Sequence, residues 1–400
     1  MSEPLLLTFN AGSSTLKIGL YSVANGEPAP LGRGKIDFNR APLQFEYSNG
    51  GDAHTVPLAA PVTDDLHGVL DEALNWIDAH LSVHELVSVG HRVVHGGDAF
   101  DGPVRIDDRT LAAIAALVPL APLHQPQSVR LIRALRHLRP HLPQVASFDT
   151  AFHRTQSDLV RRFALPRALF DEGVKRYGFH GLSYRYVAGR LRERHPSIAR
   201  GKIVTAHLGS GASLCALDAG VSRDTSMGFS TLDGIPMATR CGALDAGVVL
   251  HLQKTLGQTV DDVEQMLYHR SGLLGVSGVS GDARVLLADP SAGARDALEL
   301  FAFRIAGEAA RLAATLGGLD ALVFTAGIGE HQPQTRAAVC ERLRWLGVEL
   351  DAGANARNAE IVSRDGSRVA VLVVPTDEEQ VIARDAASVL HARAPGSAGR

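Results

Sequence analysis

Apolar side chains form two short strand-like runs at the start of the chain, residues 5–9 and 15–21, and the turn Asn-Ala-Gly-Ser-Ser separates them. Alternating apolar runs around a Gly and Ser turn are typical of a β-hairpin. The turn also has the composition of a phosphate cradle, because glycine lets backbone approach a ligand, hydroxyl and N–H groups donate, and Lys17 adds a charge. On these residues alone the hairpin is the favoured interpretation.

Helical and strand-like periodicity then alternate. Apolar residues at helical spacing predict a helix over residues 63–81, with Asp64 as its cap, and further helices near 108–117 and 127–138. Between them, "LVSVGHRVVHGGDAF" reads as a strand entering a Gly-rich turn, and "QVASFDTAFH" reads as a short buried strand ending at Asp149.

The second half of the chain repeats the opening pattern. Residues 201–217 again read as strand, Gly-Ser turn and strand, and aligning Gly12 with Gly209 brings Asn10 opposite His207. A long helix is predicted near 296–316, followed by a buried strand that enters a Gly-rich turn in "ALVFTAGIGEH".

The chain closes with a predicted strand over residues 368–374 and a final helix that is expected to pack on the first domain. The fold class predicted is α/β, with two duplicated domains flanking an active-site cleft. The first domain is expected to comprise residues 1–150 and 380–400, and the second residues 151–379.

Composition and charge narrow the class of protein. The 400 residues are 45% hydrophobic and 21% charged, as in ordinary soluble globular proteins, and the net charge of −3 gives no reason to expect nucleic acid or a membrane as partner. The three cysteines are far apart, so a reducing, cytoplasmic location is expected. No apolar run approaches membrane-spanning length, and the N-terminal run is too short for a signal peptide.

Three Gly-rich turns, at residues 10–14, 207–211 and 327–331, call for a common explanation. None fits the P-loop or the dinucleotide-binding fingerprint. Two hairpins and a strand–turn–helix would suit a nucleotide held between two lobes, with phosphates gripped by the hairpins.

Several polar residues in predicted loops could be there either for function or for structure. Arg92 and Arg240 lie in Gly-rich loops, where a guanidinium suits carboxylate or phosphate, although arginine is common in this chain. Asp149 ends a buried strand, a frequent position for active groups, but it also suits a turn or a helix cap. The loop histidines are His124, His180 and His207.

Two further patterns concern metals. His91 and His95 have the spacing of a helical metal pair, but the local pattern is strand-like, so a zinc site is discounted. Thr376 and Glu379 match a capping box, and acidic residues are favoured in the first turn of a helix. Glu378 in the same turn would also suit Mg²⁺, which usually takes one or two protein carboxylates.

Taken together, "NAGSSTLK", "GHRVVHGG", "APLHQP", "YGFHG", "HLGSGAS", "DTSMGFS", "GDAR", "FTAGIGEH" and "PTDEE" resemble the acetate kinase family, in their order and over the whole chain. That family belongs to the superfamily of sugar kinases, actin and chaperone ATPases. The resemblance implies two actin-like (ribonuclease H-like) domains and reversible, Mg²⁺-dependent transfer of a phosphoryl group from ATP to acetate, giving acetyl phosphate and ADP. It also implies a homodimer, with Mn²⁺ as an alternative metal.

The resemblance assigns roles to residues. Asn10 and Glu378 would serve the metal. Catalysis would fall to Arg92, Asp149, His180 and Arg240, and the carboxylate would lie among Arg92, Val94, Leu123, His124, Phe179 and Thr231. Nucleotide contacts would come from Lys17, His207, Leu208, Gly209, Ser210, Gly211, Asp282, Ala283, Arg284, Gly327, Ile328, Gly329, Glu330 and His331. Acetate is already ionised at neutral pH, so Asp149 is expected to orient an arginine or metal-bound water rather than act as a base.

This chain departs from the family pattern at Gln125, Leu182, Tyr184, Ser210 and Thr231, where the family usually has Asn, Thr, His, Asn and Pro, and at several positions within "GIPMATRCGALDAG". Thr231 places a hydroxyl beside the predicted methyl pocket, so a propionate or butyrate kinase is the alternative within this class. From another class, the alternative is a non-catalytic nucleotide-binding switch. A Ser/His/Asp hydrolase is disfavoured because no G-x-S-x-G elbow occurs.

Overall fold

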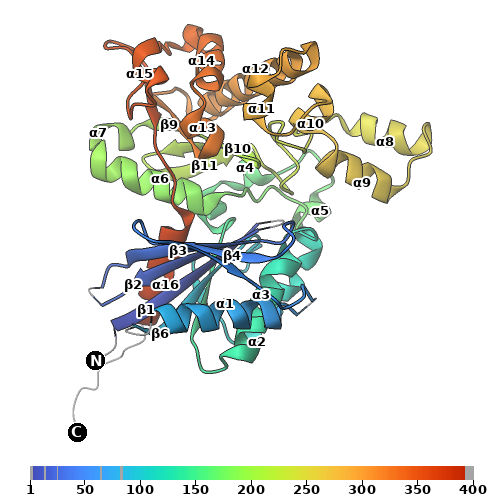
Figure 1. Ribbon diagram of the computed structural model, residues 1–400. Coiled ribbons are helices and arrows are strands. Elements are labelled where there is room, and N and C mark those ends of the chain that lie inside the picture. Colours follow the sequence, from blue (N-terminus) through green and yellow to red (C-terminus); the bar gives the residue numbers. More distant parts are fainter. Residues whose placement is uncertain (1–2, 13–14, 25, 64, 82–83, 392–400) are drawn as a thin grey trace. The chain divides into compact units, whose positions relative to one another are not determined.

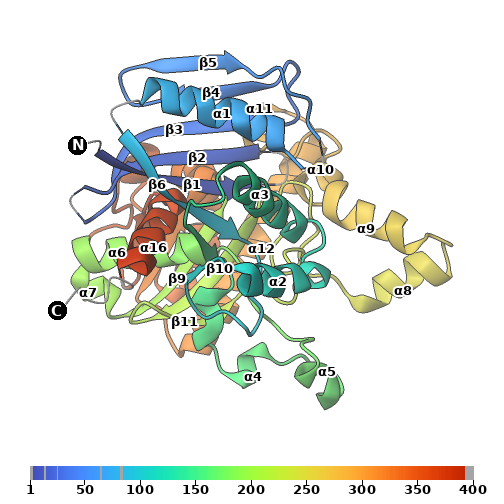
Figure 2. The ribbon, with the colours of Figure 1, turned by 90° about the horizontal axis from the view of Figure 1, so that it is seen from below.

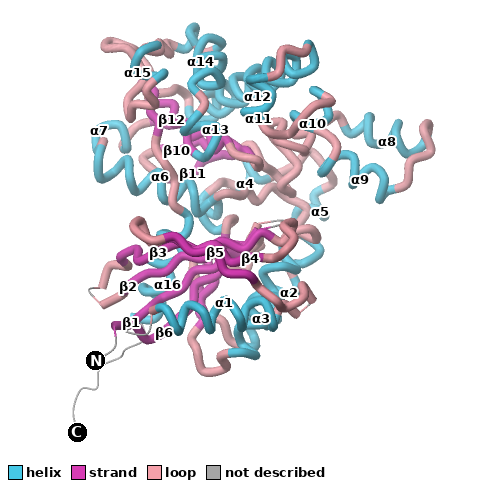
Figure 3. Tube along the Cα trace, viewed as in Figure 1, coloured by secondary structure: helices cyan, strands magenta, loops and turns pink. Residues whose placement is uncertain are grey.

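The computed structural model describes residues 3–12, 15–24, 26–63, 65–81 and 84–391. The chain forms two compact units, Met1–Phe152 with Asp377–Arg400 (the first unit) and His153–Thr376 (the second unit). Figures 1 and 3 show that each unit gathers its strands into one sheet and surrounds them with helices. Across the described ranges, no helix is long and apolar enough to cross a membrane.

The first unit has an eight-stranded sheet with the order β5-β4-β3-β2-β1-β6-β8-β7. Strands β1 to β5 pair antiparallel, whereas β1, β6 and β8 run parallel. The strands are β1 (Glu3–Ala11), β2 (Thr15–Ser22), β3 (Ala29–Asp37), β4 (Gln44–Ser48), β5 (Ala53–Pro57), β6 (His84–Val93), β7 (Val104–Arg105) and β8 (Gln144–Phe148). The helices are α1 (His67–His80), α2 (Asp108–Ala116), α3 (Gln125–Leu138) and α16 (Glu378–His391), with the 3₁₀ turn η1 (Val118–Leu120).

Alternation along β1 explains how the first sheet is covered on both faces, since successive side chains of a strand point to opposite sides. Leu5, Leu7 and Phe9 lie in a core with residues of α1 and α3. Leu6 lies in a separate core with Tyr21, Val145 and three alanines of α16, Ala383, Ala386 and Ala387. The final helix therefore packs on the first unit (Figure 2).

The second unit has a five-stranded sheet with the order β11-β10-β9-β12-β13. Its strands are β9 (Lys202–Leu208), β10 (Ala212–Asp218), β11 (Val221–Thr225), β12 (Ala321–Thr325) and β13 (Ala370–Val373). Its helices are α4 (Asp158–Arg161), α5 (Arg167–Asp171), α6 (Gly181–Arg194), α7 (Pro196–Ala199), α8 (Ala246–Lys254), α9 (Val260–His269), α10 (Gly272–Ser277), α11 (Ala283–Ala288), α12 (Ala292–Leu316), α13 (Ala326–His331), α14 (Pro333–Arg342) and α15 (Ala352–Ala356), with the 3₁₀ turn η3 (Arg344–Leu346).

The two sheets share one topology. The order β3-β2-β1-β6-β8 in the first unit recurs as β11-β10-β9-β12-β13 in the second, with an antiparallel hairpin followed by two parallel strands in each. The predicted duplication and the predicted α/β class are confirmed, and the fold is a two-domain actin-like one.

Two local predictions need correction. The helix predicted over 63–81 begins at His67, after Leu66 in a left-handed conformation, and its predicted cap Asp64 lies outside the described residues. The capping box of Thr376 and Glu379 is wrong: Asp377 accepts from the N–H of Gln380, while the Thr376 hydroxyl accepts from Ser183. Asp377 caps the helix because it lies one residue closer to it, and this leaves Glu379 available for other contacts.

His91 and His95 are buried in the first unit and His153 is buried in the second. His91 Nε2 lies 2.8 Å from Gln144 Oε1, and His95 Nδ1 accepts from the N–H of Gly97, so neither belongs to a helical metal pair. Burial lowers the pKa of each of the three histidines to about 4.

These histidines predict a pH dependence of stability. Between pH 6.5 and 4 the unfolded chain binds more protons than the folded chain, so the stability that the neutral rings contribute is complete above pH 6.5 and is lost as the pH falls toward 4. We expect the midpoint of urea unfolding to fall over this window, and His91→Gln to flatten the fall. His137→Gln, at an exposed position, is the control; equal pH slopes for wild type and His91→Gln would contradict the prediction.

Candidate functional site

In the first unit, Arg92 at the end of β6 is held by Asp149, which follows β8. Arg92 Nε donates to both carboxylate oxygens of Asp149, at 3.0 and 3.1 Å, and Nη2 donates at 2.6 Å. The Asp149 side chain is 1% exposed and that of Arg92 is 16% exposed. Burial lowers the pKa of Arg92, but Asp149 and then Glu378 and Glu379 outweigh this effect and raise it above its usual value. The guanidinium is therefore fixed in place and charged.

Asn10 connects this ion pair to the last helix. Its Oδ1 accepts from Arg92 Nη1 at 3.0 Å, and its Nδ2 donates to Glu378 Oε2 at 3.0 Å and to Glu379 Oε1 at 2.9 Å. Three carboxylates and one guanidinium thus lie in one hydrogen-bonded set, with an excess of two negative charges. Sequence reasoning assigned Glu379 to a helix cap and so missed its place here.

Carboxylate oxygens beside an amide fit a hard divalent cation that takes one or two protein carboxylates and completes its shell with phosphate and water. Glu378 and Glu379 provide those oxygens, whereas Asn10 Oδ1 is engaged by Arg92. Within the described ranges, no cluster of three or more His, Cys, Asp or Glu side chains is placed to hold a metal. The residues present therefore fit Mg²⁺ shared with a phosphate ligand rather than a closed protein cage.

The other predicted residues of the first unit lie around the loop after β6. Val94 is buried, Leu123 is 36% exposed and His124 is half-buried at the start of α3. Lys17 is exposed on β2 and is paired in register with Asn10 on β1; Ser13 and Ser14 of the turn lie outside the described residues.

Gln125, one of the positions at which this protein departs from the family pattern, hydrogen-bonds to the backbone of this loop. It accepts from the His95 N–H and donates to the carbonyls of His95 and Ile114. It is fully buried, and its hydrogen bonds fix the backbone of His95 in the loop after β6.

In the second unit, His180, His207 and Arg240 meet at the β9–β10 hairpin. The rings of His180 and His207 stack with centroids 4.3 Å apart and an interplanar angle of 17°. A Cβ at Gly211 would lie 3.4 Å from His180 Nε2 and 3.9 Å from Arg240 Nη1. Glycine in the hairpin therefore leaves room for a ligand atom between an imidazole and a guanidinium. His180 itself has φ 57°, a left-handed conformation that is uncommon outside glycine and frequent at functional sites.

Arg240 is carried by a loop with a fixed backbone. Its Nη1 donates to the carbonyl of Thr231 at 3.1 Å, and its own carbonyl accepts from the N–H of Met237. Gly272 permits this packing, because a Cβ there would lie 2.1 Å from the Met237 carbonyl oxygen and 2.7 Å from that of Arg240. Thr231 is buried, with 8% exposure.

Phe179 is held by a buried histidine. Its carbonyl lies 2.9 Å from His153 Nε2, while His153 Nδ1 contacts Ser222 Oγ at 2.9 Å. The predicted carboxylate-binding residues are therefore divided, with Phe179 and Thr231 in the second unit and the others in the first.

A cavity of about 730 Å³ in the second unit collects most of the predicted nucleotide residues. The glycine and serine of the hairpin, the start of α11 and the start of α13 converge on it. Its lining includes Gly209, Ser210, Asp282, Ala283, Arg284, Gly327, Ile328 and His331. Leu208, Gly211, Gly329 and Glu330 are neighbours of these residues in the sequence but are not among the residues that line the cavity. His207, on β9, contacts Ser183 Oγ through its Nδ1.

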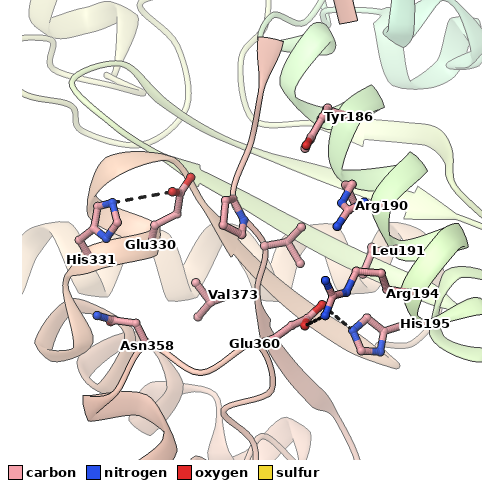
Figure 4. A pocket seen from close by; sticks show the side chains of 12 residues that line it. Tyr186, Arg190, Leu191, Arg194, His195, Glu330, His331, Asn358, Glu360 and Val373 are labelled. Carbon is pink, nitrogen blue, oxygen red and sulfur yellow. Dashed lines mark hydrogen bonds and ion pairs between the residues drawn. The ribbon is translucent and has the colours of Figure 1, made fainter. Parts of the chain in front are cut away.

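Glu330, in α13, does not line that cavity but fixes the backbone at the start of its own helix. Its Oε1 accepts from the N–H of Ala326 at 2.8 Å and from that of Thr376 at 3.2 Å. With His331 it also borders a second cavity of about 390 Å³ beside α6, where Arg194 and His195 share the carboxylate of Glu360 (Figure 4).

A further residue of this loop region, Arg336, carries no sequence signal of function. It is fully buried, and its Nη1 donates to the carbonyls of Gly329 and Glu330 while Nε and Nη2 donate to Asn355. Its burial depends on a partner 19 residues away, so an ordinary helical pattern around it gives no hint of this role.

Comparison with known proteins identifies the family of this chain. Residues 5–384 match the acetokinase family. An acetate kinase of Rhodopseudomonas palustris is 48% identical over 390 residues, covering 95% of this chain and 97% of that protein. The structure of a propionate kinase from Francisella tularensis has a TM-score of 0.89 at 33% identity, covering 97% of this chain and all of that one. An acetate kinase of Porphyromonas gingivalis has a TM-score of 0.86 at 33% identity with the same coverage. This chain belongs to the acetokinase family.

Proposed function

We propose that this protein is an acetate kinase, which reversibly transfers the γ-phosphoryl group of ATP to acetate and yields acetyl phosphate and ADP. The observation that carries the proposal is the convergence of His180 Nε2 and Arg240 Nη1 on Gly211, in a hairpin whose neighbouring residues line the large cavity. A guanidinium fork and a hydrogen-bonding ring close to each other suit phosphoryl transfer, which depends mainly on positioning and charge stabilisation.

Acetate needs no base to become a nucleophile, because it is ionised at neutral pH. The obstacle is the approach of one anion to another, and two arginines reduce that repulsion. Arg92 and Arg240 bind the carboxylate and the transferring phosphoryl, and His180 donates to that phosphoryl. Asp149 acts through Arg92, since it holds the guanidinium with three hydrogen-bond contacts.

The nucleotide occupies the large cavity of the second unit in this proposal. The hairpin residues Gly209 and Ser210 lie beside the phosphates, and the segments 282–284 and 327–331 surround the nucleoside. Lys17 supplies a further charge to the phosphates. When bound, Mg²⁺ (or Mn²⁺) would neutralise phosphate charge, with Glu378 and Glu379 as its protein oxygens and Asn10 as the residue that orients them.

The direct test is trapping of acyl phosphate with hydroxylamine from ATP, Mg²⁺ and acetate, with propionate and butyrate in parallel. Acetate-dependent hydroxamate, highest among the three acids, is the expected result. A higher rate with propionate or butyrate would favour the alternative acid. ATP binding without product from any acid would favour the non-catalytic switch.

Thr231 is the residue expected to set preference among acids. Thr231→Val keeps the shape of this buried side chain and removes its hydroxyl, so we expect the ratio of kcat/KM for propionate over acetate to rise about threefold to tenfold. Thr155→Val, which also removes a hydrogen-bonding hydroxyl in the second unit, is the control with an unchanged ratio. An unaltered ratio in Thr231→Val would remove Thr231 from the acid pocket.

A homodimer and a cytoplasmic location are part of the same proposal. The arm formed by α8 and α9 extends away from the sheet of its unit (Figures 1 and 2). All residues of α8 (246–254) are described by the structure, and none of them is buried. Val248 is 40% exposed, Leu250 51% and Leu256 58%. Apolar side chains gathered on one projecting arm suit coverage by a second copy of the chain.

We therefore expect Leu250→Glu to convert a dimer to a monomer in light scattering coupled to size-exclusion chromatography. Leu159→Glu carries the same change at an 84% exposed position outside the arm and is expected to remain dimeric. A dimer that persists in Leu250→Glu would place the interface elsewhere.

A further inference from the structure

Serine hydroxyl groups contact the two stacked histidines of the second unit, His180 and His207. Ser183 Oγ lies 2.8 Å from His207 Nδ1, and Ser213 Oγ on β10 lies 2.8 Å from His180 Nδ1. Ser213 and His207 are register partners across the β9–β10 hairpin, which explains why the two rings stack. Each ring thus presents its Nδ1 to a serine.

Tyr184, one of the departures from the family pattern, extends the second of these contacts. Its phenol oxygen hydrogen-bonds to Ser213 Oγ, so Tyr184, Ser213 and His180 form a chain of three groups. Tyr184 and Ser213 have no exposed surface. His180 Nε2, at the other side of its ring, faces the Gly211 position beside Arg240.

The positions of the protons on Tyr184, Ser213 and His180 follow from which atoms can donate and which can accept a hydrogen bond. A buried O–H that does not donate is costly, and within the described residues the phenol of Tyr184 has Ser213 Oγ as its hydrogen-bond partner. Burial raises the pKa of the Tyr184 phenol above its usual value, so it stays protonated at neutral pH. Tyr184 must then donate to Ser213. The hydroxyl proton of Ser213 is directed to His180 Nδ1, and the neutral ring carries its own proton on Nε2.

We propose that Ser213 is a positioning residue that fixes His180 in the neutral tautomer with its proton on Nε2, from which it donates to the transferring phosphoryl, and that Tyr184, which can only donate to Ser213, prevents the hydrogen bonds from reversing. The inference rests on the proposed function for the identity of that acceptor. A histidine at position 184, as the family usually has, would either donate to Ser213 or accept from it. A buried tyrosine can only donate its hydrogen bond to Ser213. The tautomer of His180 is therefore fixed more firmly in this protein than it would be with histidine at position 184.

The test reads the tautomer directly. Protein labelled with ¹⁵N in histidine is studied by two-dimensional ¹H–¹⁵N NMR at pH 8, and the His180 signals are assigned by their loss in His180→Gln. The wild type is expected to show a protonated Nε2 and an unprotonated Nδ1. Ser213→Ala and Tyr184→His are expected to show a mixture of His180 tautomers. The first substitution removes the donor to Nδ1, and the second allows the hydrogen bonds between residues 184, 213 and 180 to run in either direction.

Tyr184→Phe separates this mechanism from simple packing. It leaves Ser213 with His180 Nδ1 as its acceptor, so the tautomer is expected to be kept and kcat to stay within about threefold. Tyr184→His and Ser213→Ala are expected to lower kcat about tenfold, with KM for ATP and acetate within about twofold. Ser226→Ala, another buried serine of this unit that accepts a backbone N–H, is the control with unchanged kcat.

A wild-type ring protonated on Nδ1 would overturn the proposal. So would an unchanged tautomer in both Ser213→Ala and Tyr184→His, or an equal loss of kcat in Tyr184→Phe and Tyr184→His. Failure of the proposed function gives a different result: His180→Gln would stay active while the NMR series behaves as expected.

Discussion

Asp149→Ala is expected to lower the free energy of unfolding by about 3–5 kcal/mol and to remove nearly all kinase activity. The reason is that the substitution leaves the half-buried guanidinium of Arg92 without the carboxylate that binds it at 2.6 to 3.1 Å. Arg92 would then lose its orientation as well as its charge partner. Urea unfolding and hydroxamate formation measure the two effects on the same preparation.

Asp224→Ala provides a matched control for that result. Asp224 is a buried carboxylate of the second unit that accepts from Arg311 at 2.7 Å and from Thr315 at 2.9 Å, away from the site residues. It is expected to lose stability but to keep kcat at temperatures where it remains folded. Asp149→Ala with wild-type kcat would show that Arg92 does not need its carboxylate, and would contradict the assigned role.

Arg240→Ala is expected to reduce kcat about a thousandfold, because it removes the guanidinium beside His180 on which transition-state charge would develop. Its effect on stability should stay within about 1 kcal/mol, since the side chain is half-buried and the hydrogen bond that it donates to the carbonyl of Thr231 has a neutral acceptor. Steady-state kinetics and thermal unfolding give both numbers.

Arg240→Lys tests whether charge or fork geometry matters. A lysine keeps the charge but cannot bind two oxygens in one plane, so we expect activity between wild type and Arg240→Ala. Full activity of Arg240→Ala in a folded protein would place the phosphoryl group elsewhere.

Sequence periodicity predicts both hairpins, because each joins neighbouring segments through a turn whose own residues are informative. It does not predict β3 to β5, for a reason visible in the packing. Gly32 and Gly34 occupy two of the three buried positions of β3, and a Cβ there would lie 2.7 Å from Tyr47 and 2.4 Å from Phe45. The apolar volume at those positions comes from β4, so β3 shows too few apolar residues to be recognised.

Candidate residues within recognisable loops were also predictable, and the structure brings Arg92 to Asp149 and His180 to Arg240. Residues that act through distant partners were not. The role of Glu379 depends on Asn10, 369 residues away, and that of Arg336 depends on Asn355. In the family signature "DTSMGFS", Asp224 joins α12 to β11 rather than entering the site, which no pattern distinguishes in advance.

The packing of α16 has a consequence for the order in which the protein is made. This helix is the last described element, yet it covers the face of the first sheet formed by Leu6, Tyr21 and Val145, and Asp385 accepts from Ser147 on β8. During synthesis that apolar face stays uncovered until the ribosome has released the whole of the second unit. The first unit therefore begins to fold first and is completed last, with one apolar face of its sheet exposed for most of the time of translation.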